Sequence, residues 1–346
     1  MPTRVRVARM ALLIAGVAAI ASGVAVAVHP PANAATTPLP AASPPTLPDQ
    51  GSTRTRTVGV GGSIQAAIDD LAATGGGTVA LTAGTHQVTT PIQLRSNVTL
   101  SGHSSTGTNP TTLHNAAGSD MVAMLDGSSG GLSNVIIQRI KVDCALTAVQ
   151  RGSTANPGKN YGVYITDTVA PNDRILLDSV QITACAVGFH TRGTSDLTVR
   201  NCDIHHNGGS SRAFHNVYLR GVSRARLESS TFNGSNSGNG LDVSYSDNIT
   251  VFQVTANGNA VRGIRFAESD HVDVLGCIAT GNTDAGIVMN SEAKGVQTFR
   301  IHGDTATGNR VGVATSANSN QGEIWNNVIT GNAVNLDVES SETDIR

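Results

Sequence analysis

The residue types that carry acid–base and anion-binding chemistry gather in one part of this chain. The 346 residues include only 4 tyrosines, and all of them lie between positions 161 and 245. Four of the 10 histidines lie in the same part: His190, His205, His206 and His215. A surface that needed only solubility would use Lys and Glu, so this grouping indicates a functional site. The alternative is that these side chains are cross-strand packing pairs on an exposed sheet.

Such a set of side chains suits the cleavage of uronic acid chains by β-elimination. An arginine can bind the substrate carboxylate through two parallel hydrogen bonds, which neutralises it and acidifies the proton on C5. A histidine or tyrosine can remove that proton, and another can protonate the leaving oxygen. A C5 epimerase needs the same groups and returns the proton to the other face, so the residue types leave both reactions open.

The spacing of these residues follows a repeat. Apolar anchors recur every 23 to 28 residues, at Val163, Phe189, Val217, Leu241, Ile264, Ile287, Val313 and Leu336. Within a repeat, short runs such as 241–244 alternate apolar and polar residues, which predicts strands, and no 3.6-residue period is present. A period in the low twenties is typical of a solenoid. We therefore predict an all-β fold, a single-stranded right-handed parallel β-helix.

Each repeat closes with a Gly-Asn turn, and these turns predict a ladder of stacked side chains. The asparagines are Asn259, Asn282, Asn309 and Asn332. Because they recur at the same point of successive turns, we expect them to hydrogen-bond to one another rather than to a ligand.

The repeat also predicts which side chains share one face. The residue after each inward anchor faces outward, and successive turns stack about 4.8 Å apart. The predicted catalytic residues are His190, Arg192, Tyr218, Arg220 and Asp242. The predicted substrate-binding residues are Tyr164, His215, Arg262 and Arg265. In this scheme arginines bind the carboxylate, His190 and Tyr218 transfer protons, and Asp242 orients a neighbour or helps to bind a cation.

Two loop features have two interpretations each. His205 and His206 follow a strand near Gly208-Gly209, and they are either a loop-borne acid or base or two solvent-exposed turn histidines. The Gly/Ser/Thr/Asn-rich insertions 103–131 and 147–160 either wall a binding groove or are tolerated solvent loops.

The start of the repeat region resembles a known family. Residues 63–71 predict an amphipathic helix with Ser63 as its N-cap, which would cap the first turn of the solenoid. The succession SIQAAIDDLAATGGGTVALTAGTHQV and PIQLRSNVTLSG resembles the opening of the pectate-lyase-like superfamily. This resemblance covers residues 58–340 and implies the β-helix fold. It also implies the activities of that group, which are polysaccharide lyase, rhamnogalacturonase-type hydrolase and alginate epimerase.

The motifs of particular enzymes in that group are missing. A glycosidase needs two opposed carboxyl groups, whereas this face offers Asp242, with Asp167 only at a strand end. The paired-Asp and Gly-His-Gly motifs of hydrolases are absent, and the place of the epimerases' Asp-Pro-His motif reads Asp242-Val243-Ser244. No zinc spacing or run of close aspartates occurs, so we predict no metal and no cofactor, with calcium dependence left open.

The four cysteines are predicted to behave in two ways. Cys144 and Cys185 lie one position out of register on adjacent turns, within reach of a disulfide, and their pairing is left open. Cys202 and Cys277 share a column three turns apart, roughly 14 Å, so we predict that they are small buried core residues.

The amino-terminal part predicts export. Residues 1–34 are typical of a signal peptide, with Arg4, Arg6 and Arg9, an apolar run and the cleavage site Ala32-Asn33-Ala34. An uncleaved anchor is the alternative. Residues 35–56 are rich in Pro, Ala, Ser and Thr and predict a semi-extended linker that does not pack, followed by the β-helix domain at 57–346. We expect a secreted, extracellular protein.

These features predict a lyase that acts on an acidic, uronic-acid polysaccharide by β-elimination. A net charge of −2 with 14% charged residues argues against nucleic acid or an anionic membrane as partner. We expect a monomer without membrane contact once the signal is cleaved. The alternatives are a C5 epimerase, a glycoside hydrolase, or a non-catalytic polysaccharide-binding or cell-surface protein. The aromatic content of 3% favours the last.

Overall fold

The computed structural model describes residues 41–49, 51–116, 121–147, 150, 160–291 and 293–346. The predicted signal peptide, the start of the linker and parts of both insertions lie outside these residues. Within the described ranges, no helix is both long and apolar enough to cross a membrane.

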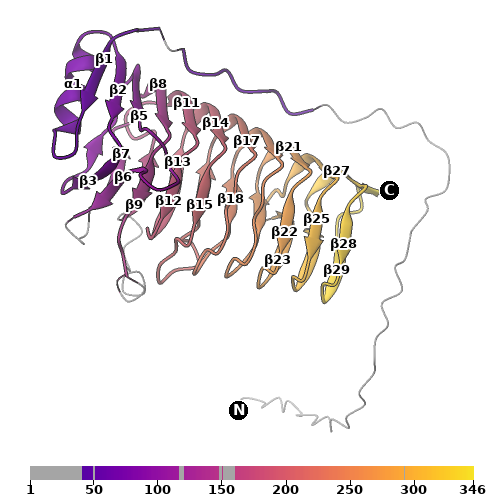
Figure 1. The fold of residues 1–346 in the computed structure, drawn as a ribbon. Helices are drawn as coiled ribbons and strands as arrows, with labels where there is room; N and C mark the ends of the chain where they lie inside the picture. Colours follow the sequence, from indigo (N-terminus) through magenta and orange to yellow (C-terminus); the bar gives the residue numbers. More distant parts are fainter. Residues whose placement is uncertain (1–40, 50, 117–120, 148–149, 151–159, 292) are drawn as a thin grey trace, which may run out of the picture.

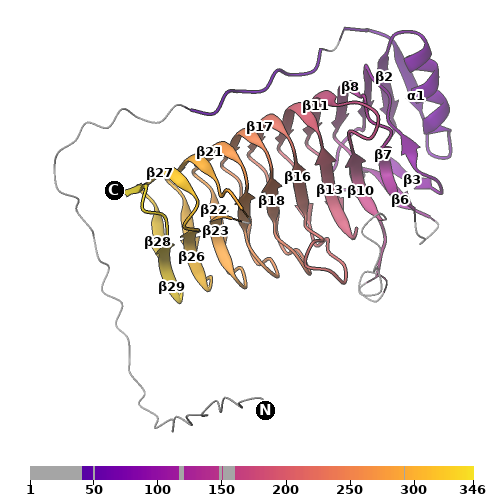
Figure 2. The ribbon, with the colours of Figure 1, turned by 180° about the vertical axis from the view of Figure 1, so that it is seen from behind.

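The chain coils into an elongated parallel β-solenoid (Figure 1, Figure 2). Sheet A has 12 strands, in the order β1 (Thr55–Val58), β2 (Gly77–Leu81), β5 (Val98–Ser101), β8 (Ser133–Gln138), β11 (Asn172–Asp178), β14 (Thr194–Arg200), β17 (Ser223–Glu228), β19 (Asp247–Phe252), β21 (Asp270–Leu275), β24 (Gln297–His302), β27 (Asn320–Trp325) and β30 (Thr343–Ile345). The prediction of an all-β parallel solenoid is confirmed.

Two further faces complete each coil. Sheet C has 10 strands: β4 (Ile92–Gln93), β7 (Ala123–Gly127), β10 (Tyr161–Ile165), β13 (Val187–Arg192), β16 (Val217–Arg220), β18 (Leu241–Ser244), β20 (Ile264–Ala267), β23 (Ala285–Asn290), β26 (Val311–Thr315) and β29 (Val334–Val338). Sheet B is split into β3 (Gly84–Val88), β6 (Thr111–Asn115), β9 (Lys141–Asp143), β12 (Gln181–Thr183) and β15 (Asp203–His205), and β22 (Ile278–Thr280), β25 (Thr305–Thr307) and β28 (Val328–Thr330). Single bridges through Thr231 and Thr255 join these two parts.

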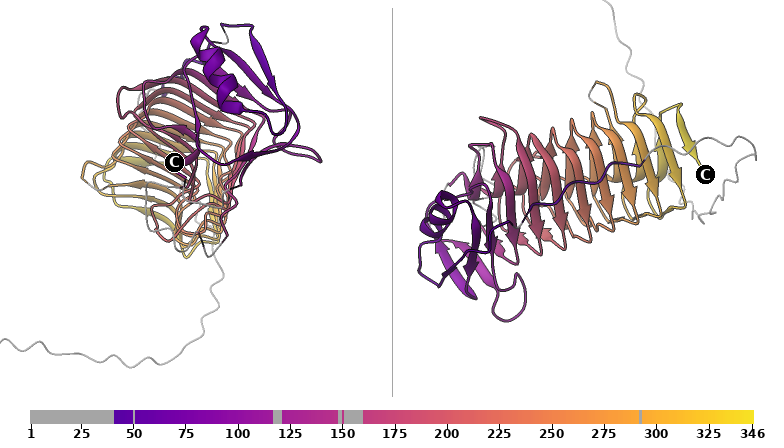
Figure 3. Two further views of the ribbon diagram at one scale, coloured as in Figure 1. Left: turned by 90° about the vertical axis from the view of Figure 1, so that its left-hand side faces the viewer. Right: turned by 90° about the horizontal axis from the view of Figure 1, so that it is seen from above.

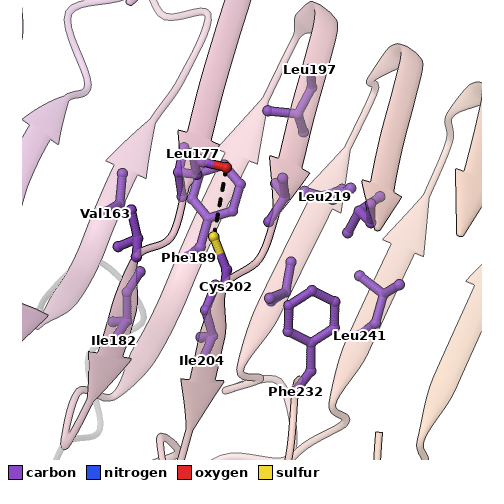
Figure 4. Packing of buried hydrophobic residues seen from close by; sticks show 14 of the residues in the cluster. Val163, Leu177, Ile182, Phe189, Leu197, Cys202, Ile204, Leu219, Phe232 and Leu241 are labelled. Carbon is purple, nitrogen blue, oxygen red and sulfur yellow. Dashed lines mark hydrogen bonds between the residues drawn. The ribbon is translucent and has the colours of Figure 1, made fainter. Parts of the chain in front are cut away.

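One apolar core runs along the inside of the coils. The predicted anchors Val163, Phe189 and Leu241 are fully buried there, because alternate residues of each strand face inward. Figure 4 shows how they pack with Cys202, whose thiol points to the carbonyl oxygen of Leu177 at 3.6 Å. Cys202 and Cys277 are free and buried, and Cys144 is disulfide-bonded to Cys185. Both cysteine predictions are therefore in agreement with the structure.

The predicted asparagine ladder is confirmed. Asn259 Nδ2 donates to Asn282 Oδ1 at 2.9 Å, and Asn282 Nδ2 donates to Asn309 Oδ1 at 3.0 Å. Asn309 Nδ2 then donates to Asn332 Oδ1 at 3.1 Å. Each Oδ1 also accepts the backbone N–H of the preceding asparagine, so the ladder satisfies buried polar groups at one corner of the solenoid.

A helix, α1 (Ile64–Ala73), lies at the amino-terminal end and packs against β1 and β2 (Figure 1). Ser63 Oγ accepts the backbone N–H of Ala66 at 3.2 Å, as an N-cap does. Ile64, Ile68 and Leu71 form its buried face.

Residues 41–49 differ from the predicted free linker, because they lie along the outer face of sheet A (Figure 3). Their backbone N–H groups donate to side chains of four sheet A strands: Ala42 to Asp273 at 2.9 Å, Ser43 to Asn248, Thr46 to Asp196 at 3.0 Å, and Asp49 to Asn134. Proline-rich composition indicates that a segment forms no core of its own, but its remaining N–H groups can still bind acceptors on a neighbouring surface. Thr55 and Arg56, at the end of the predicted linker, belong to β1.

Candidate functional site

Strand pairing in sheet C places the predicted residues in one row. Tyr164 pairs with His190, His190 with Tyr218, Tyr218 with Asp242, and Asp242 with Arg265. A second row, two residues further along each strand, pairs Arg192 with Arg220 and Arg220 with Ser244. The register expected from the repeat is therefore the register observed.

A cleft of about 420 Å³ lies over the middle of this row. Six predicted residues line it: His215, Tyr218, Arg220, Asp242, Arg262 and Arg265. The lining also includes Arg212, Ala213, Asn239, Ser244, Tyr245 and Val261. The other three predicted residues, Tyr164, His190 and Arg192, are not part of its lining.

Asp242 is buried at the floor of the cleft and its carboxylate is heavily hydrogen-bonded. Its Oδ2 accepts Asn239 Nδ2 at 2.6 Å, and its Oδ1 accepts the hydroxyl of Ser244 at 3.1 Å. Arg265 Nη1 lies 3.1 Å from both oxygens. A carboxylate held in this way is suited to positioning its neighbours, and proton transfer through it would break several contacts.

His215 is a buried neutral ring with a defined tautomer. The backbone N–H of Asn239 donates to His215 Nδ1 at 2.9 Å, so the proton of the neutral ring sits on Nε2. This Nε2 faces Asp242 Oδ2 at 3.6 Å. Burial lowers the pKa of His215; the Asp242 charge opposes this, whereas Arg265 and Arg262 add to the lowering. His215, which was predicted to bind substrate, lies within the lining of the cleft.

The charges in the cleft make it an anion site. Its lining contains four arginines, Arg212, Arg220, Arg262 and Arg265, against one carboxylate, Asp242. Arg262 Nε also lies 3.0 Å from Asp284, which is outside the lining. With His215 neutral, the excess of positive charge favours a ligand with carboxylate groups.

Tyr218 and Tyr245 lie on either side of Arg220. Arg220 Nη1 donates to Tyr218 Oη at 3.4 Å, and its guanidinium carbon lies 4.5 Å from the centre of the Tyr245 ring. Tyr218 is therefore a phenol beside a cation within an anion-binding cleft, which is an arrangement suited to proton transfer.

His190 belongs to an aromatic row beside the cleft. Its ring lies 5.2 Å from that of Tyr164 and 4.7 Å from that of Tyr218, while Tyr161 stacks on Tyr164 at 4.3 Å. His190 Nε2 is buried and has no hydrogen-bond partner among the described residues. Burial, with added repulsion from His215, Arg192 and Arg220, lowers the pKa of His190 to about 3. His190 is thus a neutral ring beside Tyr218, and its proton-transfer role stays a prediction.

The remaining predicted residues lie toward the amino-terminal side of the row. Arg192 is exposed and pairs with Asp167 at 3.0 Å. Burial raises the pKa of Tyr164, and Asp126 adds to this effect while Arg192 opposes it, so Tyr164 stays protonated. These positions lie outside the cleft and suit contact with a neighbouring part of a long ligand.

Arg212 and Tyr245 line the cleft but were not among the predicted site residues. Arg212 lies in the segment between β15 and β16, which does not follow the repeat. Tyr245 follows β18 with a left-handed φ of 54°, which points its ring back over Arg220. The concentration of tyrosine in this part of the chain was the one available signal for Tyr245.

The chain belongs to a known family: residues 146–346 match the family described as periplasmic copper-binding protein (NosD). No curated protein matches it.

Solved structures with this fold include right-handed β-helix proteins of several kinds. PfbA, a surface adhesin of Streptococcus pneumoniae, is 14% identical, with a TM-score of 0.58 over 81% of this chain and 76% of that one. A tailspike protein of E. coli bacteriophage HK620 in complex with a hexasaccharide is 16% identical, with a TM-score of 0.56 over 82% and 54%. Pectate lyase Pel9A is 16% identical, with a TM-score of 0.48 over 86% and 80%. The resemblance to the pectate-lyase-like superfamily is confirmed at the level of fold.

The cleft is a poor site for a copper ion. The ring nitrogens of its one histidine face the Asn239 N–H and the Asp242 carboxylate, and arginines surround that carboxylate. A cation would meet four guanidinium groups there, so any copper site must lie elsewhere in the chain.

Proposed function

We propose that the cleft binds an acidic, uronic-acid polysaccharide and cleaves it by β-elimination. The observation that carries this proposal is a single cleft that holds four arginines, the hydrogen-bonded carboxylate of Asp242 and the contact between Tyr218 and Arg220. The row of aromatic and cationic side chains continues along sheet C, so a polymer has room to lie across several coils.

The reaction assigns one role to each part of the cleft. Arginine side chains bind the substrate carboxylate and withdraw charge from C5. The ionised form of Tyr218, with Arg220 as its counter-ion, takes the C5 proton. The electrons of that bond form the C4–C5 double bond, the glycosidic oxygen leaves, and Tyr218 returns the proton to it. Asp242 holds Arg265 in place, and no cofactor is invoked, because the arginines supply the positive charge.

The same geometry makes hydrolysis a weaker proposal. Glycosidases use two carboxyl groups on opposite sides of the scissile bond. Asp242 is the one carboxylate that lines this cleft, and it is bound by Asn239, Ser244 and Arg265. C5 epimerisation stays a proposal of the same class, since it needs the same residues.

The experiment is to incubate the protein with a panel of polyuronates and follow the ultraviolet absorbance of the unsaturated product. The matched control is each polymer after reduction of its carboxyl groups. We expect absorbance to rise with at least one polyuronate and with none of the reduced polymers. If no absorbance appears but C5 protons exchange with solvent, the reaction is epimerisation. If the polymer binds without either change, the cleft is a non-catalytic binding site.

We propose copper binding as a second function. The family described as periplasmic copper-binding protein supports it, together with a close contact between two histidines on sheet B. We also propose that the protein acts outside the cytoplasm as a monomer after loss of its signal, and that α1 caps the first coil. Fractionation of cells tests the location, and sizing of the purified protein tests the monomer. Removal of residues 63–73 tests the capping role of α1.

A further inference from the structure

We propose that His205 and His206 bind one copper ion through their Nδ1 atoms. This inference rests on the second proposed function and names its site. It is independent of the cleft described above, because His205 ends β15 on sheet B and His206 follows it directly, whereas the cleft lies on sheet C.

The two imidazoles are placed as a pair of ligands. His205 Nδ1 and His206 Nδ1 lie 2.6 Å apart. Two ring nitrogens at this distance need one proton between them, whichever ring carries it. A copper ion can replace that proton with a small rotation of the rings, and the proton then leaves to solvent. Imidazole nitrogen suits copper, which stands at the top of the affinity order for divalent first-row metals.

The backbone brings the two rings together. Consecutive residues of a strand point to opposite faces, so His205 and His206 would separate in a regular strand. His206 instead has a left-handed φ of 53°, and its N–H donates to Asn233 O at 3.1 Å. Asn236 Nδ2 also donates to His206 O at 3.1 Å, which fixes this turn.

Comparison with the neighbouring coils shows that the fold does not require a histidine here. Strand bridges align His206 with Gly234, Gly258 and Gly281 in the next coils, with φ values of 60°, 62° and 66°. Glycine adopts this conformation at lower cost than a residue with a side chain. The preceding coil has Ala184 at this corner, with a φ of 57°, so neither glycine nor histidine is required by the fold, and the His206 side chain is available for a ligand role.

The far side of the His205 ring faces a carboxylate and an amide group. His205 Nε2 lies 3.5 Å from Asp203 Oδ2 and 3.3 Å from Gln181 Nε2. Asp203 is fixed in turn, because Thr231 Oγ1 donates to its Oδ1 at 2.6 Å and Gln181 to its Oδ2 at 3.1 Å. The Gln181 amide is a donor, so His205 Nε2 accepts from it in the metal-free protein. Coordination through Nδ1 places the ring proton on Nε2, toward the Asp203 carboxylate, and the Gln181 contact is then given up.

A second group of donors provides the control. Asp247, Asp270 and His271 hold one ligand atom each within 4.8 Å of one another on sheet A. His271 Nδ1 is paired with Asp247 at 3.0 Å, and the set offers one imidazole and two carboxylates. Copper should favour the pair of imidazoles.

The test is titration of Cu(II) into the purified protein in competition with a chelator, with electron paramagnetic resonance to count bound nitrogens. We expect one tightly bound ion with two imidazole nitrogens. His206→Gly should lower its affinity at least about tenfold. This variant takes the residue that neighbouring coils use, so its unfolding midpoint should not fall. His271→Ala should bind as the wild type does.

The contrary outcomes overturn either the site alone or the site together with the second proposed function. If the wild type binds no Cu(II), both the second proposed function and this site are wrong. If the wild type binds but His206→Gly binds equally well, the second function stands and this site is wrong. The site is also wrong if His271→Ala is the variant that loses the ion.

Discussion

Arg265 and Asp242 form a buried ion pair on adjacent coils, with Arg265 Nη1 3.1 Å from both carboxylate oxygens. Only 11% of the Arg265 side chain and 3% of the Asp242 side chain are exposed. The pair is therefore shielded from solvent, and it fixes one of the cationic groups that the proposed substrate would meet.

Replacing Asp242 with Asn should destabilise the protein and weaken the cleft together. The substitution leaves the Arg265 charge buried without its counter-ion, which costs roughly 3–5 kcal/mol. Asp167→Asn is the matched control, because its partner Arg192 is exposed and such pairs contribute about 1 kcal/mol or less. Urea unfolding of both variants measures the difference. Equal losses in the two variants would contradict the central position of Asp242.

His190 should stay neutral across the physiological range. Its pKa, lowered to about 3 by burial, means that its NMR resonances should not titrate between pH 5 and pH 8. In the unfolded chain the same group takes up a proton near pH 6.5. His190 therefore lowers the stability of the fold as pH falls from about 6.5 to about 3, by up to roughly 1.4 kcal/mol per pH unit.

His190→Phe should remove this share of the pH dependence while keeping an aromatic ring between Tyr164 and Tyr218. The free energy of unfolding, measured at several pH values for both proteins, tests this. If His190 titrates near pH 6.5 in the folded protein, its ring is more open to solvent than the structure indicates.

Asp304 should produce the opposite pH dependence. It is buried, its Oδ1 accepts the Cys277 N–H at 2.6 Å, and its Oδ2 has no hydrogen-bond partner within the described ranges. Burial raises the pKa of Asp304 to about 8, well above that of an unfolded Asp near 4. The unfolded chain thus loses this proton first, and stability falls as pH rises from about 4 to about 8.

Asp304→Asn retains the acceptor and cannot ionise. We expect it to raise the free energy of unfolding by roughly 1–3 kcal/mol at pH 8 and to leave it nearly unchanged at pH 4. A variant that is less stable than the wild type at pH 8 would show that the carboxylate is ionised and stabilising there.

The asparagine ladder should stabilise the fold most where its side chains are buried. Asn282→Ala removes the acceptor of the Asn259 N–H and the donors to Ala256 and Asn309, which should cost roughly 2–4 kcal/mol. Asn332→Ala, in the same column but near the more exposed end, should cost less. Chemical denaturation measures the free energy of unfolding of both variants. A larger loss of stability in Asn332→Ala than in Asn282→Ala would contradict the dependence on burial.

Much of the fold could be predicted because each repeat has the same short-range pattern of apolar and polar residues. Alternation in runs such as 241–244, with apolar anchors at a fixed interval, determines the strands, their register and the inward face. The same register placed Tyr218, Asp242 and Arg265 in one row. The offset of one position between Cys144 and Cys185 showed that a disulfide was within reach but left the pairing open, and the structure has the bond.

What could not be predicted depends on contacts between distant segments. The row on sheet C holds more candidates than the cleft does, and the segment that contributes Arg212 decides which of them line it. The burial of His190 and the hydrogen bonds of Asp242 could not be read from the repeat. The attachment of residues 41–49 to sheet A likewise depends on acceptors such as Asp273, more than 200 residues away, which composition does not reveal.

The most direct test of the proposed function compares the rate of unsaturated product formation by the wild type, Tyr218→Phe and Tyr164→Phe on the best polyuronate. Tyr218→Phe removes the hydroxyl in the cleft, and Tyr164→Phe removes one outside it. We predict a loss of at least about a hundredfold for Tyr218→Phe and little change for Tyr164→Phe. A wild-type rate in Tyr218→Phe would contradict proton transfer by Tyr218 and, with it, the proposed elimination in this cleft.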